Sequence, residues 1–306
     1  KDNSKMPVSV LNALPRAVDQ LFHPNLSKND YGVGDTISGR YITLFFSVLI
    51  ILLLFTWSRQ LYGINAGLFS AFLFVCCPNN MANAVLVTTD TYAVFFLLAT
   101  MYFLWRYCNS KSNKDFIYLA VMLALSQLVK QSLFHLYILV PFCLLVYCIA
   151  CKEKINRASF IKNLLIVVSI SWVVINAGFI FWHWHKPLAD YRFMSSLFQH
   201  VQDIFPGWLP VPFSESFITG LDQAKYYDQL GGGLLQSSFA NVTILGHSSA
   251  GGSFWYYYFV SIFFKTPITY LILIGWATYI QFKKPGFKNF WRNEFFLFAP
   301  IIYFLL

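Results

Sequence analysis

Residues 88–105 carry the sequence TTDTYAVFFLLATMYFLW, an apolar run that begins with two threonines and an aspartate. Its apolar part, residues 91–105, predicts a membrane helix. Asp90 is the only carboxylate between Arg59 and Arg106, and a carboxylate costs roughly 2.5–3.5 kcal/mol at the centre of a membrane helix and less near an interface. Two interpretations stay open: Asp90 caps the helix at the membrane surface, or it serves a site that faces water or the bundle interior.

The composition places the chain among helical membrane proteins. Of its 306 residues, 57% are hydrophobic and 11% are charged, whereas about 25% of the residues of a soluble domain are charged. The net charge of +9 is therefore interpreted by its distribution across the bilayer, not as a sign of nucleic-acid binding. The six cysteines lie in or beside apolar runs without metal-ligand spacing, so we expect no disulfide framework. We predict an all-α, polytopic integral membrane protein.

About eight apolar runs divide the chain, and we expect them to form a single transmembrane domain over residues 1–306. The expected spans are residues 41–57, 64–77, 91–105, 116–129, 133–150, 164–184 and 254–282, with an eighth that begins near residue 295. The chain begins at Lys1 without a methionine and ends inside an apolar run, so we expect a fragment cut at both ends.

Two polar segments are expected outside the membrane. Residues 1–40 contain apolar residues at near-helical spacing, which predicts an amphipathic helix lying on the membrane surface. Residues 185–253 form a second loop, rich in glycine, proline and aromatic residues. His183 and His185 lie at its boundary, where a metal-binding pair is one interpretation and an interfacial belt beside two tryptophans is the favoured one.

Basic residues are distributed unequally between the connections. Alternate connections hold twelve basic and three acidic residues, whereas the rest of the chain holds ten of each. By the positive-inside rule the first set faces the cytoplasm, which leaves both long polar segments, Asp90 and Lys130 at the outer face. The twelve basic residues are Arg59, Arg106, Lys111, Lys114, Lys152, Lys154, Arg157, Lys162, Lys283, Lys284, Lys288 and Arg292.

Five polar residues mark starts, ends or breaks of apolar runs on this outer side: Lys5, Arg40, Asp90, Lys130 and Lys265. One carboxylate with several cations at one face suggests an anionic ligand, such as a phosphate, beside a general base. Lys130 can instead anchor its helix by reaching to the interface. Lys265 lies inside an apolar run beside a proline, and such a helix break is tolerated where the backbone faces protein or a wet cavity.

Several short motifs, taken in order, resemble the protein O-mannosyltransferase and aminoarabinose transferase superfamily. Residues 77–106, from Cys-Pro through Thr-Asp to the aromatic end Tyr-Phe-Leu-Trp-Arg, are similar to its third-to-fourth helix region. Residues 128–131, Leu-Val-Lys-Gln, are similar to its Leu-Thr-Lys break, with Val in place of Thr. Further matches, which extend the resemblance over nearly the whole chain, are residues 4–7 (SKMP), 38–40 (SGR), 59–63 (RQLYG), 252–258 (GSFWYYY) and 264–267 (FKTP).

The resemblance implies a GT-C type glycosyltransferase that uses a polyprenyl-phosphate sugar on the outer side of the membrane. It implies a catalytic role for Asp90, donor-phosphate binding by four cations and substrate lining by three aromatic residues. The cations are Lys5, Arg40, Lys130 and Lys265, and the aromatic residues are Trp255, Tyr256 and Tyr257. The superfamily's principal catalytic aspartate lies in its first outer loop, so we expect it upstream of Lys1. No metal ligand is assigned, and a divalent metal ion stays open as a cofactor.

We therefore expect a mannosyltransferase-like enzyme that moves a sugar to a lipid, glycan or protein acceptor on the outer membrane face. The expected location is a bacterial inner membrane, with the site facing the periplasm. The expected partners are the polyprenyl-phosphate sugar donor and membrane lipids, and no nucleic acid. Two alternatives stay open: a transporter or flippase for an anionic lipid or solute, and a non-catalytic subunit of an envelope assembly. The chain has no evident internal repeat of the kind common in transporters, which favours the enzyme.

Overall fold

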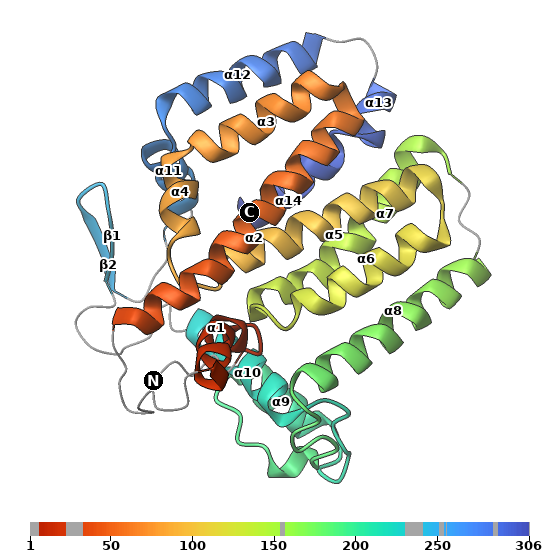
Figure 1. The fold of residues 1–306 in the computed structure, drawn as a ribbon. Helices are drawn as coiled ribbons and strands as arrows, with labels where there is room; N and C mark the ends of the chain where they lie inside the picture. The colour runs from red at the N-terminus through yellow and green to blue at the C-terminus, as the bar shows by residue number, and fades with distance from the viewer. Residues whose placement is uncertain are drawn as a thin grey trace. The chain divides into compact units, whose positions relative to one another are not determined.

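The computed structural model of the protein describes residues 6–22, 33–153, 157–229, 241–250, 254, 256–283 and 287–305. The described chain is mostly helical, with one two-stranded antiparallel sheet (Figure 1). It divides into two compact units. The larger unit contains Met6–Ser171 and Thr278–Phe304, and the smaller unit contains Trp172–Ala277.

The larger unit is built from helices alone within the described residues. These are α1 (Ser9–Phe22), α2 (Val33–Tyr62), α3 (Ile64–Cys76), α4 (Pro78–Ala84), α5 (Asp90–Ser110), α6 (Asn113–Ser126), the 3-10 helix η1 (Gln131–His135), α7 (Leu136–Cys151), α13 (Phe287–Arg292) and α14 (Phe295–Leu305). The smaller unit holds η2 (Leu188–Asp190), α9 (Ser196–Ile204), α10 (Glu215–Gln229), β1 (Asn241–Ile244), β2 (His247–Ala250) and α11 (Tyr257–Lys265). Two helices, α8 (Arg157–Gly178) and α12 (Ile268–Lys283), contribute to both units.

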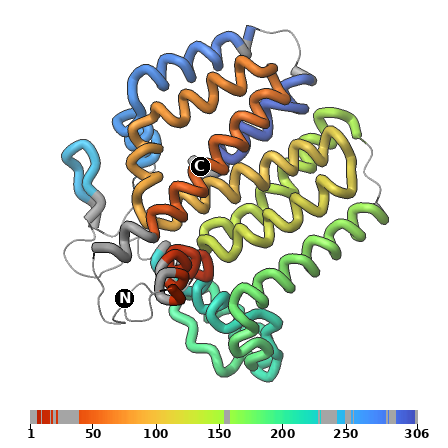
Figure 2. The backbone as a smooth tube through the Cα atoms, in the orientation of Figure 1, coloured from red at the N-terminus to blue at the C-terminus, as the bar shows by residue number. Residues whose placement is uncertain are grey.

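Helix α5 forms the core of the larger unit, where it contacts α2, α6, α7 and α13. Nine of its 21 residues are buried, including Tyr92, Thr100 and Trp105. The path of the chain shows α5 and α6 as an antiparallel hairpin (Figure 2). Lys111 makes the turn possible by adopting a left-handed conformation (φ 53°), and the side chain of Ser112 then caps α6. The apolar run of residues 91–105 thus belongs to the central helix of this unit.

Prolines bend two of the apolar runs. Pro78 begins α4 after the extended residue Cys77, and α3 and α4 meet at 69°. Pro267 follows the extended residue Thr266, and α11 and α12 meet at 113°. Proline has no N–H to continue the helical ladder, so a bend at these positions is expected. The interruption predicted inside the run 254–282 is confirmed.

By length and composition, three of the described helices can cross a membrane, or up to five if each bent pair counts as one span. The three cover Gly39–Tyr62, Gln131–Cys151 and Ala158–Gly178. This supports a polytopic membrane protein. Each of the eight expected runs overlaps a helix, but only some of these helices are long and apolar enough to cross a membrane. Helices α6 and α14 have 14 and 11 residues, and α5 carries polar and aromatic side chains that it buries against its neighbours.

Both predicted polar segments contain helices. The amphipathic helix expected within residues 1–40 corresponds to α1, whose residues Val10, Leu14 and Leu21 are exposed, as suits a helix on a membrane surface. The expected loop 185–253 contains η2, α9, α10 and the β1–β2 hairpin, with a small apolar core of Leu188, Tyr191 and Phe193. The span expected over residues 164–184 is shifted toward the N-terminus, because α8 covers Arg157–Gly178 and the chain then turns.

Candidate functional site

Asp90 and Lys130 form an ion pair in the larger unit. The Lys130 ammonium donates to Asp90 Oδ1 at 2.7 Å, and the side chains of Lys130 and Asp90 are 44% and 56% exposed. Asp90 is the first residue of α5, and Thr89, which makes no side-chain capping bond, occupies the N-cap position. Asp90 is therefore not the N-cap residue itself, and its service in a functional site stays a prediction. Its carboxylate instead lies in the first helical turn, where the helix dipole favours a negative charge.

A break between α6 and η1 positions Lys130. Helix α6 ends at Ser126, and Lys130 has an extended backbone (φ −156°). Gln127, which is 1% exposed, fills the break, and its Nε2 donates to Leu123 O at 3.3 Å, to Ser126 Oγ at 2.9 Å and to Leu133 O at 3.2 Å. These bonds satisfy carbonyl groups that the interrupted helix leaves free. The hinge predicted at this position is confirmed, and the buried amide gives Lys130 a fixed frame.

Helix α1 and the residue before it are hydrogen-bonded to residues that lie two positions from Asp90 and from Lys130. The backbone N–H of Val8 donates to Leu128 O at 3.2 Å, two residues before Lys130. The hydroxyl of Tyr92, a fully buried residue two positions after Asp90, donates to Asn12 Oδ1. The start of α5 and the end of α6 are therefore both fastened to the N-terminal helix.

Arg40 lies on α2 beside the loop that leads to Asp90. A Cβ placed on the preceding residue, Gly39, would lie 3.3 Å from the Val87 side chain and 3.5 Å from the carbonyl oxygen of Asn12. Glycine at this position therefore permits close packing of α2 against α1 and the loop. Arg40 itself is exposed.

Two hydrogen-bonding groups beside the pair lack partners among the described residues. They are the Thr88 hydroxyl and the Gln131 side-chain amide nitrogen, and both atoms are buried. Thr88 lies two residues before Asp90, and Gln131 directly follows Lys130. A buried polar group without a partner is costly, so such groups call for a ligand or water. Sequence reasoning did not assign either residue to the site, although both are polar residues next to helix breaks.

The remaining predicted site residues are placed as follows. Lys265 is exposed at the end of α11, directly before the Pro267 bend. Tyr256 and Tyr257 lie at the start of α11, partly buried, and their rings contact those of Phe254 and Tyr258. These three residues belong to the smaller unit. Lys5 and Trp255 lie outside the described residues. Of the predicted site residues, the structure thus brings together Asp90 and Lys130.

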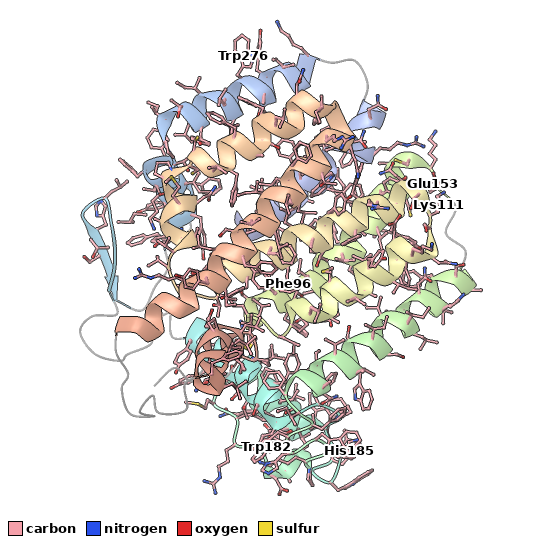
Figure 3. All side chains as sticks on the ribbon, in the orientation of Figure 1. Phe96, Lys111, Glu153, Trp182, His185 and Trp276 are labelled. Atoms are coloured by element: carbon pink, nitrogen blue, oxygen red, sulfur yellow. The ribbon has the colours of Figure 1, made fainter. Side chains whose placement is uncertain are left out.

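The opposite end of the α5–α6 hairpin is held by a different set of polar contacts. Arg106 pairs with the buried Asp115 at 2.9 Å, and Ser110 donates to the same carboxylate at 2.6 Å. Lys111 pairs with Glu153, and the two lie together at the turn (Figure 3). These contacts lock the turn and the neighbouring α7 terminus. The unpartnered groups of Thr88 and Gln131 border the other end of the hairpin, whereas Arg292, whose Nε is also buried without a partner among the described residues, accepts from Asn109 at this end.

A carboxylate that contacts a lysine and a histidine lies in the smaller unit. Glu215 accepts from the Lys186 ammonium at 2.6 Å and pairs with His183 Nδ1 at 2.6 Å. The hydrogen bond from Lys186, followed by that from His183, lowers the pKa of Glu215 below its ordinary value. Within the described ranges no group of three or more His, Cys, Asp or Glu residues could hold a metal ion. His183 is a hydrogen-bond partner of Glu215. The neighbouring Trp182 is exposed in the turn after α8 (Figure 3).

Comparison with known families supports the predicted resemblance. Residues 32–182 match the family described as dolichyl-phosphate-mannose-protein mannosyltransferase, and this segment includes Arg40, Asp90 and Lys130. No curated protein and no solved structure matches the chain. The family implies a glycosyltransferase with a polyprenyl-phosphate sugar donor. Over residues 32–182, the chain is thus similar to the dolichyl-phosphate-mannose-protein mannosyltransferase family.

Proposed function

We propose that the protein transfers a sugar from a polyprenyl-phosphate donor to a lipid, glycan or protein acceptor on the outer face of a membrane, with the site facing the periplasm of a bacterial inner membrane. The family match over residues 32–182 supports the enzyme class and the donor class. The Asp90–Lys130 ion pair carries the proposal for the site, because it sets a carboxylate beside a cation within the matched segment.

In this proposal Lys130 holds the donor phosphate. A phosphate oxygen takes a place at the Lys130 ammonium beside or instead of Asp90, and a charge-assisted hydrogen bond of this kind is stronger than a neutral one. The Thr88 hydroxyl and the Gln131 amide are further donors for the same anion, since both are buried without a partner among the described residues. Arg40 and Lys265, and with them Lys5, are kept as candidate cations for the phosphate. Trp255, Tyr256 and Tyr257 are kept as candidate substrate-lining residues.

Asp90 acts on the acceptor in the same proposal, either as general base or by orienting the nucleophile. The acceptor hydroxyl oxygen forms a bond to the anomeric carbon while the bond from that carbon to the phosphate oxygen breaks. The hydroxyl proton passes to the Asp90 carboxylate, and the electron pair of the broken bond leaves with polyprenyl phosphate. Attack from the side opposite the phosphate inverts the anomeric centre. Lys130 stabilises the negative charge on the leaving phosphate.

Donor affinity of two lysine variants tests this assignment in the full protein, reconstituted in lipid nanodiscs. Lys130→Met should weaken binding of a polyprenyl-phosphate sugar by about 10- to 100-fold, because a hydrogen bond to a charged group contributes about 1.5–3 kcal/mol. Lys111→Met is the matched control, since Lys111 also pairs with a carboxylate and its side chain is 63% exposed. Equal donor affinity of the two variants would contradict phosphate binding by Lys130 and would favour the alternative, in which Lys130 anchors its helix at the membrane interface.

The same preparation separates the enzyme from the competing class. A glycosyltransferase should release polyprenyl phosphate and produce a glycosylated acceptor. Donor binding without release, together with movement of the intact lipid between leaflets, would favour a flippase instead.

A further inference from the structure

Helix α9 uses one side to fasten itself to the smaller unit. Phe198 packs against the core of Leu188, Tyr191 and Phe193. The side-chain amide of Gln202 donates to Leu188 O at 2.7 Å and to Tyr191 O at 3.0 Å. The Gln199 amide also donates to Phe193 O at 2.9 Å, so one aromatic residue and two amides hold this side of the helix.

A different side of α9 is apolar and exposed. Leu197, Val201 and Ile204 are 50%, 36% and 62% exposed, and their spacing of four and three residues places them in one stripe along the helix. The chain that follows adds Phe205 and Trp208, which are 49% and 76% exposed. Contiguous apolar surface of this kind marks an interaction site in a folded protein.

The smaller unit also contains the end of a candidate membrane span. Helix α8 meets the span criterion over Ala158–Gly178, and only 11% of its most apolar window is buried within the protein. The turn that follows exposes Ile180, Trp182 and Trp184 at 86%, 60% and 40%. Tryptophan is enriched at the level where a membrane helix leaves the hydrocarbon.

Backbone hydrogen bonds join this turn region to the Trp208 loop. The N–H of His185 donates to Val211 O at 3.1 Å. The N–H of Ala189 donates to Gly207 O at 2.9 Å. The exit from α8 and the loop that follows α9 therefore belong to one folded piece of the smaller unit.

We propose that α9 and the Trp208 loop lie in the membrane interface, with Leu197, Val201 and Ile204 in contact with lipid. The partner of this surface is a bilayer, because the exit from the α8 span is hydrogen-bonded to the loop that follows α9, and both expose tryptophans, the residues typical of that depth. Asp203, exposed on another side of α9, faces water. The assignment extends beyond sugar transfer and does not depend on it: it concerns how the smaller unit is held at the membrane.

Photo-crosslinking in nanodiscs of phosphatidylcholine and phosphatidylglycerol tests the assignment with the full protein. The photoreactive residue p-benzoylphenylalanine replaces Ile204 in one variant and Asp203 in the matched control. After irradiation, mass spectrometry should detect lipid adducts at position 204 in at least tenfold higher yield than at position 203. Both positions are exposed, so folding should persist, and size-exclusion elution together with near-ultraviolet circular dichroism checks that it does.

Three results would overturn the assignment. Equal lipid yields at the two positions would show that the stripe does not select the bilayer. Adducts at position 204 with twice the mass of the chain would show that a second copy covers it. Adducts with a co-reconstituted acceptor protein, in place of lipid, would make the stripe a protein-binding surface.

Discussion

Asp90 and Lys130 are each about half-exposed, and this limits what their ion pair contributes to folding. Exposed ion pairs stabilise proteins by about 0–1 kcal/mol, because solvent screens the charges and both side chains lose freedom. The larger unit has other means of holding the start of α5, such as the Tyr92–Asn12 hydrogen bond and the contacts of α5 with α2. A large effect of a substitution at Asp90 would therefore report on chemistry and not on stability.

Asp90→Asn tests this directly. Asparagine preserves the shape of the side chain and removes its charge, so the protein should stay folded while sugar transfer falls by about 10²–10⁴-fold, the usual contribution of a positioned acid or base. The measurement is turnover of a polyprenyl-phosphate sugar in nanodiscs, with detergent melting temperature recorded alongside. Glu153→Gln, which neutralises the carboxylate paired with Lys111, should leave turnover unchanged. Near-normal turnover of Asp90→Asn would place the reacting groups elsewhere.

Glu215 gives the smaller unit a defined response to acid. Its folded-state pKa is lowered by Lys186 and His183, so the stabilisation is fully present above the ordinary carboxyl value of 4.5 and is lost as the pH falls through the lower folded value. Hydrogen exchange of residues 182–215 should accelerate on acidification below pH 4.5 in the parent protein, beyond the intrinsic effect of pH. Glu215→Gln should weaken protection at neutral pH and flatten this dependence, whereas Asp203→Asn should not. A parent-like pH profile in Glu215→Gln would contradict the assignment.

At the scale of helices and breaks, sequence patterns located much of the structure. The apolar runs overlap helices, and the breaks at Lys130 and at Pro267 lie where polar residues and proline interrupt those runs. These are local signals, because a helix end or a bend depends on the few residues around it. The α8 boundary was less accurate, since the aromatic turn after Gly178 is as apolar as the helix before it.

Pairings between distant helices could not be predicted in the same way. Asp90 and Lys130 are 40 residues apart, and periodicity gives no distance between two helices. The frame around Gln127 and the unpartnered groups of Thr88 and Gln131 depend likewise on how the ends of α5 and α6 pack. For residues 188–229 the sequence predicts only a polar loop. Their small apolar core forms only when η2, α9 and α10 pack together, which periodicity does not show.

The packing of α2 against α3 depends on the absence of a side chain at Gly67. A Cβ there would lie 2.9 Å from the carbonyl oxygen of Phe55 and 3.1 Å from Arg59 Cβ, so Gly67→Ala must push the two helices apart. Overpacking of this kind typically costs about 1–3 kcal/mol. Gly275→Ala on α12 is the matched control, because no heavy atom lies within 4 Å of the added carbon. Thermal unfolding in detergent should show a lower midpoint for Gly67→Ala only; equal midpoints would mean that the α2–α3 contact is looser than described.

For the whole molecule, the α5–α6 hairpin links the candidate site to membrane orientation. Helix α5 has 21 residues, which by length alone is enough to cross a hydrocarbon layer about 30 Å thick at about 1.5 Å per residue, although its composition is too polar for it to count among the candidate spans. Asp90 begins this helix and Lys130 follows its antiparallel neighbour, whereas Arg106 and Lys111 lie at the other end of the hairpin. The two ends of one hairpin therefore carry the proposed donor site and part of the basic set that the positive-inside rule assigns to the cytoplasm.

Cysteine labelling of intact cells with a membrane-impermeant maleimide tests this orientation. Lys111→Cys should stay unlabelled until the membrane is permeabilised, because its side chain is exposed at the predicted cytoplasmic end. Ala224→Cys, at an exposed position on α10 in the predicted outer segment, should react at once. The parent protein supplies the background from its own six cysteines, of which Cys76 is exposed. Equal labelling of the two variants in intact cells would contradict the charge-based topology. It would also move Asp90 and Lys130 away from the face on which sugar transfer is proposed.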